Sequence, residues 1–204
     1  YNLGFVQERL NNTSQALTAY RKAYALDPNY ERAYLAAARI LSRQGDTKGA
    51  IAAFTQAVHV NPSNSQTYQE LGSAYADNGD YKNAESSYRK AIAYMDPAHK
   101  DPATYYNLST VLYVLGKKDE ALSYAKQAYD NRASATGTLA VNILYNYALL
   151  CDESADVDQA ITLYQEVLKA DSSHVKAKTN FGVLCLENDQ VDTAITYLES
   201  AYKQ

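Results

Sequence analysis

The chain has 204 residues, of which 47% are hydrophobic and 21% charged, an ordinary composition for a globular protein. Its mild net charge of −4 argues against a protein that binds the phosphate backbone of nucleic acids. No apolar run approaches the roughly 20 residues needed to cross a bilayer, so we expect no membrane insertion within this segment. The sequence starts at Tyr1 rather than methionine, which suggests a fragment of a longer chain, and it indicates no cellular compartment.

A small residue is followed twelve residues later by alanine six times along the chain, which reveals an internal repeat. The pairs are Gly4/Ala16, Ala38/Ala50, Gly72/Ala84, Ser109/Ala121, Ala148/Ala160 and Gly182/Ala194. Other positions recur in phase with them, including a bulky ring four residues after the alanine and a tyrosine four residues before the small residue. The rings are Tyr20, Phe54, Tyr88 and Tyr164, and the tyrosines are Tyr34, Tyr68 and Tyr105.

Apolar residues within each half-repeat recur three and four positions apart, which is the spacing of a helix face. Glycine or an acidic-polar turn separates the two halves, as at Gly45-Asp46 and Gly116-Lys117. The pattern therefore predicts twelve helices in chain order. Their expected ranges are 1–11, 13–26, 30–44, 47–60, 64–78, 81–94, 102–115, 118–130, 138–152, 157–170, 174–188 and 191–203.

These in-phase positions resemble the tetratricopeptide repeat family across essentially the whole chain. The resemblance implies an all-α fold, a right-handed α-solenoid of six antiparallel helix–turn–helix repeats that forms one superhelical domain, 1–204. The expected repeats are approximately 1–29, 30–63, 64–98, 99–136, 137–173 and 174–204. The implied function is a scaffold or adaptor that binds a peptide or helical segment in a concave groove, without catalysis and without a cofactor.

Two repeats are longer than 34 residues, with the extra residues at 95–102 and 131–137. They are read as surface insertions, in loops or helix extensions, or alternatively as bends that shape a partner site. The last predicted helix is an ordinary second helix rather than a polar cap, so self-association through uncapped ends is a further hypothesis.

The resemblance also implies that the first helices line the groove, with groove positions two and three residues before the small residue, one after it, and four or five after it. Asparagine stands two before the small residue in four repeats, as Asn2, Asn107, Asn146 and Asn180. An amide offers both a donor and an acceptor, as a peptide backbone does. The row resembles the asparagine ladder of superhelical tetratricopeptide proteins, interrupted by Ala36 and Glu70. The alternative is that these amides only bond neighbouring helices or solvent.

Tyrosine directly precedes asparagine at Tyr106 and Tyr145, which join the candidate site. The second repeat adds the basic groove residues Arg32, Arg39 and Arg43, which we expect either to orient a bound peptide or to be solvated. The lysine, asparagine and arginine set with which chaperone-binding members of the family grip a carboxylate does not match this sequence, so that subtype is not expected.

No catalytic or metal-binding residue is predicted. The three histidines are isolated from one another and from Cys151 and Cys185, which occupy the same core position of adjacent repeats. Two other functions stay open: a targeting domain of an enzyme whose catalytic part lies outside this segment, and a helical repeat that binds RNA, against which the acidic charge balance argues.

Overall fold

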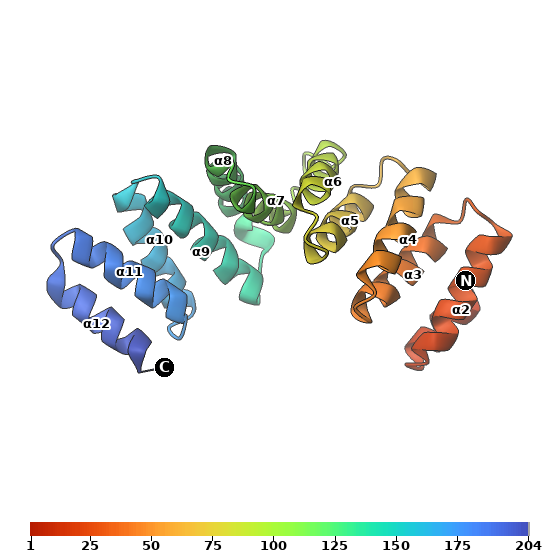
Figure 1. Cartoon of the computed structure of the whole chain (residues 1–204), viewed down its shortest axis with the longest axis horizontal. Coiled ribbons are helices and arrows are strands. Elements are labelled where there is room, and N and C mark those ends of the chain that lie inside the picture. The colour runs from red at the N-terminus through yellow and green to blue at the C-terminus, as the bar shows by residue number, and fades with distance from the viewer. Residues whose placement is uncertain (204) are drawn as a thin grey trace. The chain divides into compact units, whose positions relative to one another are not determined.

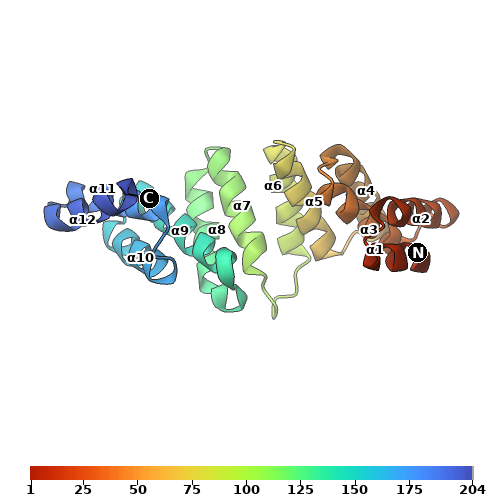
Figure 2. The same cartoon turned by 90° about the horizontal axis from the view of Figure 1, so that it is seen from below.

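The computed structural model describes residues 1–203, and within that range every regular element is a helix. Contacts divide the chain into two compact units, Tyr1–His99 and Lys100–Gln204, with six α-helices in each (Figures 1 and 2). The first unit contains α1 (Asn2–Arg9), α2 (Thr13–Leu26), α3 (Glu31–Arg43), α4 (Thr47–Val60), α5 (Ser65–Asp77) and α6 (Tyr81–Ala93). The second contains α7 (Pro102–Val114), α8 (Lys118–Asp130), the short 3₁₀ helix η1 (Arg132–Ser134), α9 (Gly137–Glu153), α10 (Val157–Ala170), α11 (Val175–Glu187) and α12 (Val191–Tyr202).

The helices form the predicted pairs, so the expected all-α repeat architecture is confirmed. In each unit, consecutive helices pack as hairpins, such as α3 with α4 and α11 with α12, and the second helix of one pair packs against the first helix of the next. Within the second unit the first helices also contact one another, α7 with α9 and α9 with α11. This places side chains from neighbouring repeats on a shared face.

The repeat positions found in the sequence form the core. All six alanines that follow the small residues are at most 1% exposed, and the four predicted rings are at most 2% exposed. A Cβ atom on Gly4 would lie 2.7 Å from the ring of Tyr20, and one on Gly72 would lie 2.8 Å from the ring of Tyr88. Small residues are needed there because a ring of the second helix rests on the backbone of the first. Many of the tyrosines are therefore packing residues.

Every helix pair turns through a residue with positive φ, seven positions after the small residue. Glycine fills this place in three repeats, as Gly45, Gly79 and Gly116. In the other three the residues are Asn11, Ala155 and Asp189, with φ of 59°, 62° and 59°. Asparagine and aspartate tolerate this left-handed conformation better than other residues with a Cβ, so Ala155 is the unusual member of the series.

Aspartates cap the second helices of three repeats. The Asp46, Asp80 and Asp156 carboxylates each accept a hydrogen bond from the backbone N–H three residues ahead, at 3.0, 3.2 and 3.4 Å. These caps satisfy donors that a helix start leaves unpaired, and Asp46 was part of a predicted turn. Local sequence therefore sets both the end of the first helix and the start of the second.

The two insertions have different structures. The first is a loop between Ala93 and Pro102, and the boundary between the two compact units falls within it. The second forms η1 and a longer first helix, since α9 has 17 residues where α7 and α11 have 13. Arg132 of η1 lies over the ring of Tyr129, 3.5 Å from its centroid, which holds the insertion against the end of α8.

Candidate binding surfaces on the first helices

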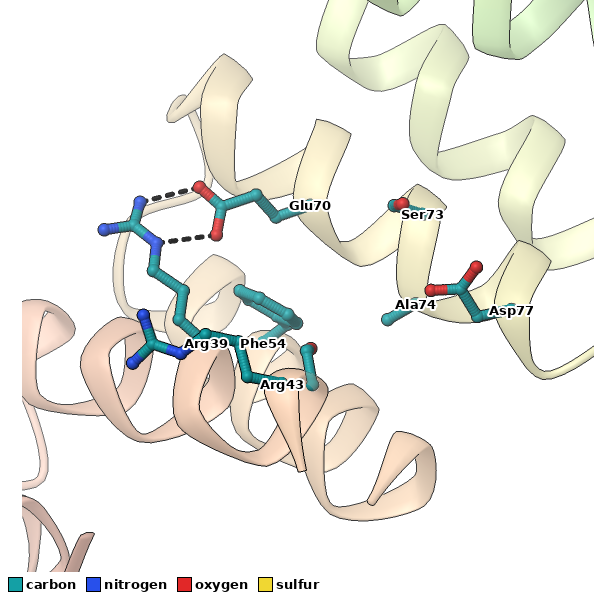
Figure 3. A pocket seen from close by; sticks show the side chains of 8 residues that line it. Arg39, Arg43, Phe54, Glu70, Ser73, Ala74 and Asp77 are labelled. Atoms are coloured by element: carbon teal, nitrogen blue, oxygen red, sulfur yellow. Dashed lines mark hydrogen bonds and ion pairs between the residues drawn. The ribbon is translucent and has the colours of Figure 1, made fainter. Parts of the chain in front are cut away.

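In the first unit, a hollow of about 380 Å³ opens between α3 and α5 (Figure 3). The side chains that line it come from three consecutive helices. They are Arg39, Ser42 and Arg43 of α3, Phe54 of α4, and Glu70, Ser73, Ala74 and Asp77 of α5. Two of the predicted groove arginines therefore form one wall of a concave surface. Ser42 and Ser73, which the sequence analysis did not single out, occupy groove registers four and one residue after a small residue.

Arg39 is bound to the facing helix by a two-point ion pair. Its Nε and Nη2 atoms donate to the two carboxylate oxygens of Glu70, at 2.8 and 2.6 Å (Figure 3). Arg43 donates a hydrogen bond to Glu8 on α1, in the preceding repeat. Glu8 also accepts a hydrogen bond from the Tyr20 hydroxyl at 3.0 Å. Both arginine charges are therefore balanced by carboxylates from adjacent repeats, and the hollow is not strongly basic.

The floor and the opposite rim differ in character. Phe54 is 2% exposed and Ala74 is 4% exposed, so the floor is apolar. Asp77 stands on the α5 rim with its carboxylate turned toward the hollow (Figure 3). Within residues 1–203 no hydrogen bond or ion pair of the Asp77 side chain is present. The lining therefore has two neutralised cations, an apolar floor and one surplus negative charge.

In the second unit, the predicted asparagines lie on the three first helices, Asn107 on α7, Asn146 on α9 and Asn180 on α11, and each is half-buried. The amide nitrogen of Asn146 donates to Ser109 Oγ at 2.9 Å. That of Asn180 donates to the hydroxyls of Tyr145 and Tyr164, at 3.2 and 3.3 Å. Two of the three amides are thus held by contacts to a neighbouring repeat, and the carbonyl oxygen of each remains without an intramolecular donor among the described residues.

The remaining predicted site residues have varied surroundings. Tyr145 is held between His174 and Tyr164, with ring centroids 4.7 and 6.4 Å away, and its burial raises the pKa of its hydroxyl. Tyr106 lies half-buried on α7. Asn2, at the start of α1, and Arg32, on the first turn of α3, are exposed. Asn2 and Arg32 belong to the first unit, whereas Asn107, Asn146 and Asn180 belong to the second.

Acidic side chains cluster near the ends of α9 and α11. Glu153 accepts hydrogen bonds from the Tyr113 hydroxyl and from Lys118 Nζ, the latter at 2.6 Å. Asp152 accepts one from the Tyr164 hydroxyl at 3.1 Å. Burial raises the pKa of Asp152, and the negative charges of Glu187 and Glu153 raise it further, while the Tyr164 hydrogen bond opposes the shift. Glu153 thus joins two repeats, whereas the Asp152 contact lies within one.

Residues 1–203 contain no group of histidine, cysteine and acidic side chains arranged to hold a metal ion. Within the same range, no helix has the length and apolar character required to span a membrane. His174 accepts a hydrogen bond from the Ala177 N–H and so caps α11, and His99 pairs with Asp96 at 2.6 Å. Cys151 and Cys185 are buried free thiols, as their shared register suggested.

Comparison with known proteins identifies the repeat. Two family models, both described as tetratricopeptide repeat, match residues 1–65, 35–100 and 149–204, and residues 102–173. No curated protein matches the chain in sequence.

Several solved structures share the fold at low sequence identity. YrrB, described as a tetratricopeptide protein with an unusual peptide-binding site, superposes with a TM-score of 0.77 at 22% identity, covering 91% of both chains. BtubC from P. vanneervenii gives 0.75 at 15% identity, over 97% of this chain and 89% of that one. MamA gives 0.74 at 21% identity, over 85% and 90%. The chain belongs to the tetratricopeptide repeat family and has the fold of a repeat scaffold for protein–protein interaction.

Proposed function

We propose that the chain binds extended segments of partner proteins on the first-helix faces of its repeats, and that it performs no catalysis itself. The observation that carries this proposal is the hollow between α3 and α5. It has a phenylalanine floor, two arginines on its wall that are each paired with a glutamate, and a surplus carboxylate at its rim. A concave surface that is mostly apolar with a few directed polar groups is the usual form of a ligand site.

The lining indicates which partner side chains the hollow would accept. An apolar side chain of the partner would rest against Phe54 and Ala74 and lose its own contact with water, since these two residues are already almost fully buried. A lysine or arginine next to it in the partner would reach Asp77, the lining charge that has no counter-ion in the described chain. Acidic partners are disfavoured because Arg39 and Arg43 are already matched by Glu70 and Glu8.

The asparagine row of the second unit would bind a partner's main chain. The hydrogen bonds to Ser109, Tyr145 and Tyr164 fix the amide planes of Asn146 and Asn180, so less rotational freedom is lost when a ligand binds. Their free carbonyl oxygens would accept backbone N–H groups of a partner, which gives affinity with little sequence preference. At these residues a contact to a neighbouring helix and a contact to a ligand are therefore compatible.

The first experiment selects short peptides from a random displayed library on the whole chain and measures the affinity of the enriched peptide by fluorescence anisotropy. We expect an enriched apolar residue beside lysine or arginine. Ser42→Trp, on the exposed wall of α3, fills the hollow and should weaken binding by about tenfold or more. Asp77→Asn should weaken it by about twofold to fivefold, since the new ion pair is exposed.

Ser86→Trp is the matched control, because Ser86 is an exposed serine on α6 that does not line the hollow. It should leave the affinity unchanged. If Ser42→Trp and Ser86→Trp bind the selected peptide equally well, the hollow is not the site. For the asparagine row, the combined change of Asn107, Asn146 and Asn180 to alanine should weaken binding by about tenfold or more. Unchanged affinity with intact helicity would exclude this role.

A further inference from the structure

The outer face of α1 is apolar and exposed, although the same face of later first helices is buried. Leu3 and Val6 stand one residue before the small residue and two after it, and they are 65% and 51% exposed. In α3, α5, α9 and α11, each of which packs against the second helix before it, both positions are at most 7% exposed. They are Ala37 and Ile40, Leu71 and Ala74, Tyr147 and Leu150, and Phe181 and Leu184. The face of α1 is therefore of the kind that receives a second helix elsewhere in the chain.

A hollow of about 370 Å³ opens beside Leu3, between α1 and α2. Its wall includes Leu3 and Gln7 from α1 and Ala19 and Lys22 from α2. The positions that match Leu3, Gln7 and Ala19 in the second repeat are at most 8% exposed, and they are Ala37, Leu41 and Ala53. The hollow is thus the counterpart of a place that is filled in the second repeat.

Leu17 of α2 shows what fills that place. Its side chain packs against the core cluster that contains Leu41 and Ala53, and also against the cluster that contains Ala37. Leu17 directly follows the repeat alanine of its helix, and leucine or isoleucine holds this position in five of the six second helices. The five are Leu17, Ile51, Leu122, Ile161 and Ile195. A branched aliphatic side chain at this register is therefore what a hollow of this kind accepts.

The member of this series on α12 is not covered. Ile195 is 51% exposed, whereas the other four are half-buried. Val191 and Tyr202, four residues before Ile195 and seven after it, are 49% and 92% exposed. These spacings place all three side chains on one side of the helix. The exposed stripe on α12 therefore has the register that α2 packs against α3.

The two faces are also complementary in charge. Helix α2 has two basic residues and no acidic one, whereas α12 has two acidic residues and no basic one. In the fifth repeat, Glu166 holds the register of Lys22 and accepts a hydrogen bond from Tyr129 of the preceding repeat. Tyr129 in turn holds the register of Tyr202. The same contact between two copies of the chain would place the Lys22 ammonium beside the Tyr202 ring, which is a favourable cation–π arrangement.

We propose that the chain associates head to tail with a second copy of itself, so that α12 of one copy inserts Ile195 into the α1–α2 hollow of the next. The contact repeats the packing of α2 against α3 within the first unit. Because the two faces differ, each copy in a pair keeps one face for a further copy, and association continues beyond a dimer unless a ring closes. Neither the α3–α5 hollow nor the asparagine row takes part, so this proposal stands independently of the proposed function.

The test is sedimentation velocity of the whole chain and of single variants across a wide range of concentration. Ile195→Asp removes the inserted side chain, and Leu3→Asp places a charge on the receiving face. Each should weaken self-association by about tenfold or more, and both should keep the helical circular dichroism because both positions are exposed. Val114→Asp is the matched control, because Val114 is also 51% exposed but lies on α7, on neither face. It should associate as the unchanged chain does.

A mixture of the two variants separates head-to-tail contact from symmetric pairing. Ile195→Asp keeps an intact hollow and Leu3→Asp keeps an intact α12 stripe. Their equimolar mixture should therefore form heterodimers that grow no further, at concentrations where each variant alone is monomeric. An unchanged chain that stays monomeric at high concentration would overturn the proposal, as would a mixture without heterodimers. Dimers that persist in either variant alone would indicate symmetric pairing and would overturn it as well.

Discussion

Arg39 on α3 and Glu70 on α5 join the first helices of two successive repeats by two parallel hydrogen bonds, 31 residues apart in sequence. The geometry is the fork-to-fork arrangement that suits guanidinium and carboxylate groups. The arginine side chain is nevertheless 46% exposed and the glutamate 23%. The pair therefore shapes the wall of the hollow more than it stabilises the fold.

The strength of this pair can be measured by a double-mutant cycle with Arg39→Ala and Glu70→Ala in urea unfolding. We expect a coupling free energy of about 0.5–1 kcal/mol, which falls as salt is added, because exposed ion pairs are screened. The exposed Lys203–Glu199 pair at the C-terminal end of α12 is the comparison, and its coupling should be smaller, about 0.3 kcal/mol. A larger coupling for the Lys203–Glu199 pair would contradict this assignment.

Replacement of Ala155 by glycine should stabilise the chain. Ala155 has a φ of 62°, a conformation that destabilises a residue with a Cβ by about 1–2 kcal/mol. Glycine removes this strain, but its greater conformational freedom in the unfolded chain offsets part of the stabilisation. We expect the free energy of unfolding to rise by about 0.5–1 kcal/mol in urea titrations. Ala52→Gly, at an exposed position inside α4, should instead lower it by up to about 1 kcal/mol. Destabilisation by both changes would contradict the strained turn.

The two cysteines should react slowly in the folded protein. Burial raises the pKa of the Cys151 thiol from 9.0 to about 11, and burial also raises that of Cys185. The thiolate is the reactive form of cysteine. At pH 8 the thiolate fraction of Cys151 is therefore about a hundredfold lower than that of a thiol with a pKa of 9.0, even without steric protection. Titration with a disulfide reagent should show both thiols protected in buffer and both reactive in denaturant. Fast reaction of either thiol in buffer would contradict its place in the core.

Asp152→Asn should stabilise the second unit at neutral pH. Burial, followed by the charges of Glu187 and Glu153, raises the pKa of Asp152 in the folded state, so ionisation of this carboxyl disfavours folding. Asparagine removes that charge and can still accept the hydrogen bond of the Tyr164 hydroxyl. The advantage should be present above the raised pKa and should vanish as the pH falls below 3.8, where Asp152 is protonated in both states. Thermal unfolding of both proteins across this pH range checks the sign.

Much of the fold could be predicted because its signals are local and repeated six times. The spacing of apolar residues set the helices, and their observed ends lie within two residues of the expected ones. Positions such as Ala38 and Phe54 were identified by register alone, and both are buried. The second insertion was harder, because Arg132 and Tyr129 hold a short helix through a contact that has no repeat counterpart.

The candidate site could be predicted only in part. Register located Arg39 and Arg43 on the concave side, but not the glutamates that neutralise them. Register placed Asn146 and Asn180 in one row, but it did not predict the hydroxyl groups that their amides contact. It also gave no reason to expect that Lys178 is buried at 6% exposure, since a lysine on a helix usually lies in solvent.

The sequence by itself determined the repeat family, the helix pairs and turns such as those at Gly45 and Gly116, since these depend on helical periodicity and on residues a few positions apart. Only the tertiary structure decided which charges cancel, which amides are oriented and which hollows remain. Those contacts join residues such as Arg39 and Glu70, or Ser109 and Asn146, 31 and 37 positions apart. The distances between such residues depend on how successive helix pairs stack. Burial of the apolar faces sets that stacking, and polar side chains form pairs only where the resulting geometry brings them together.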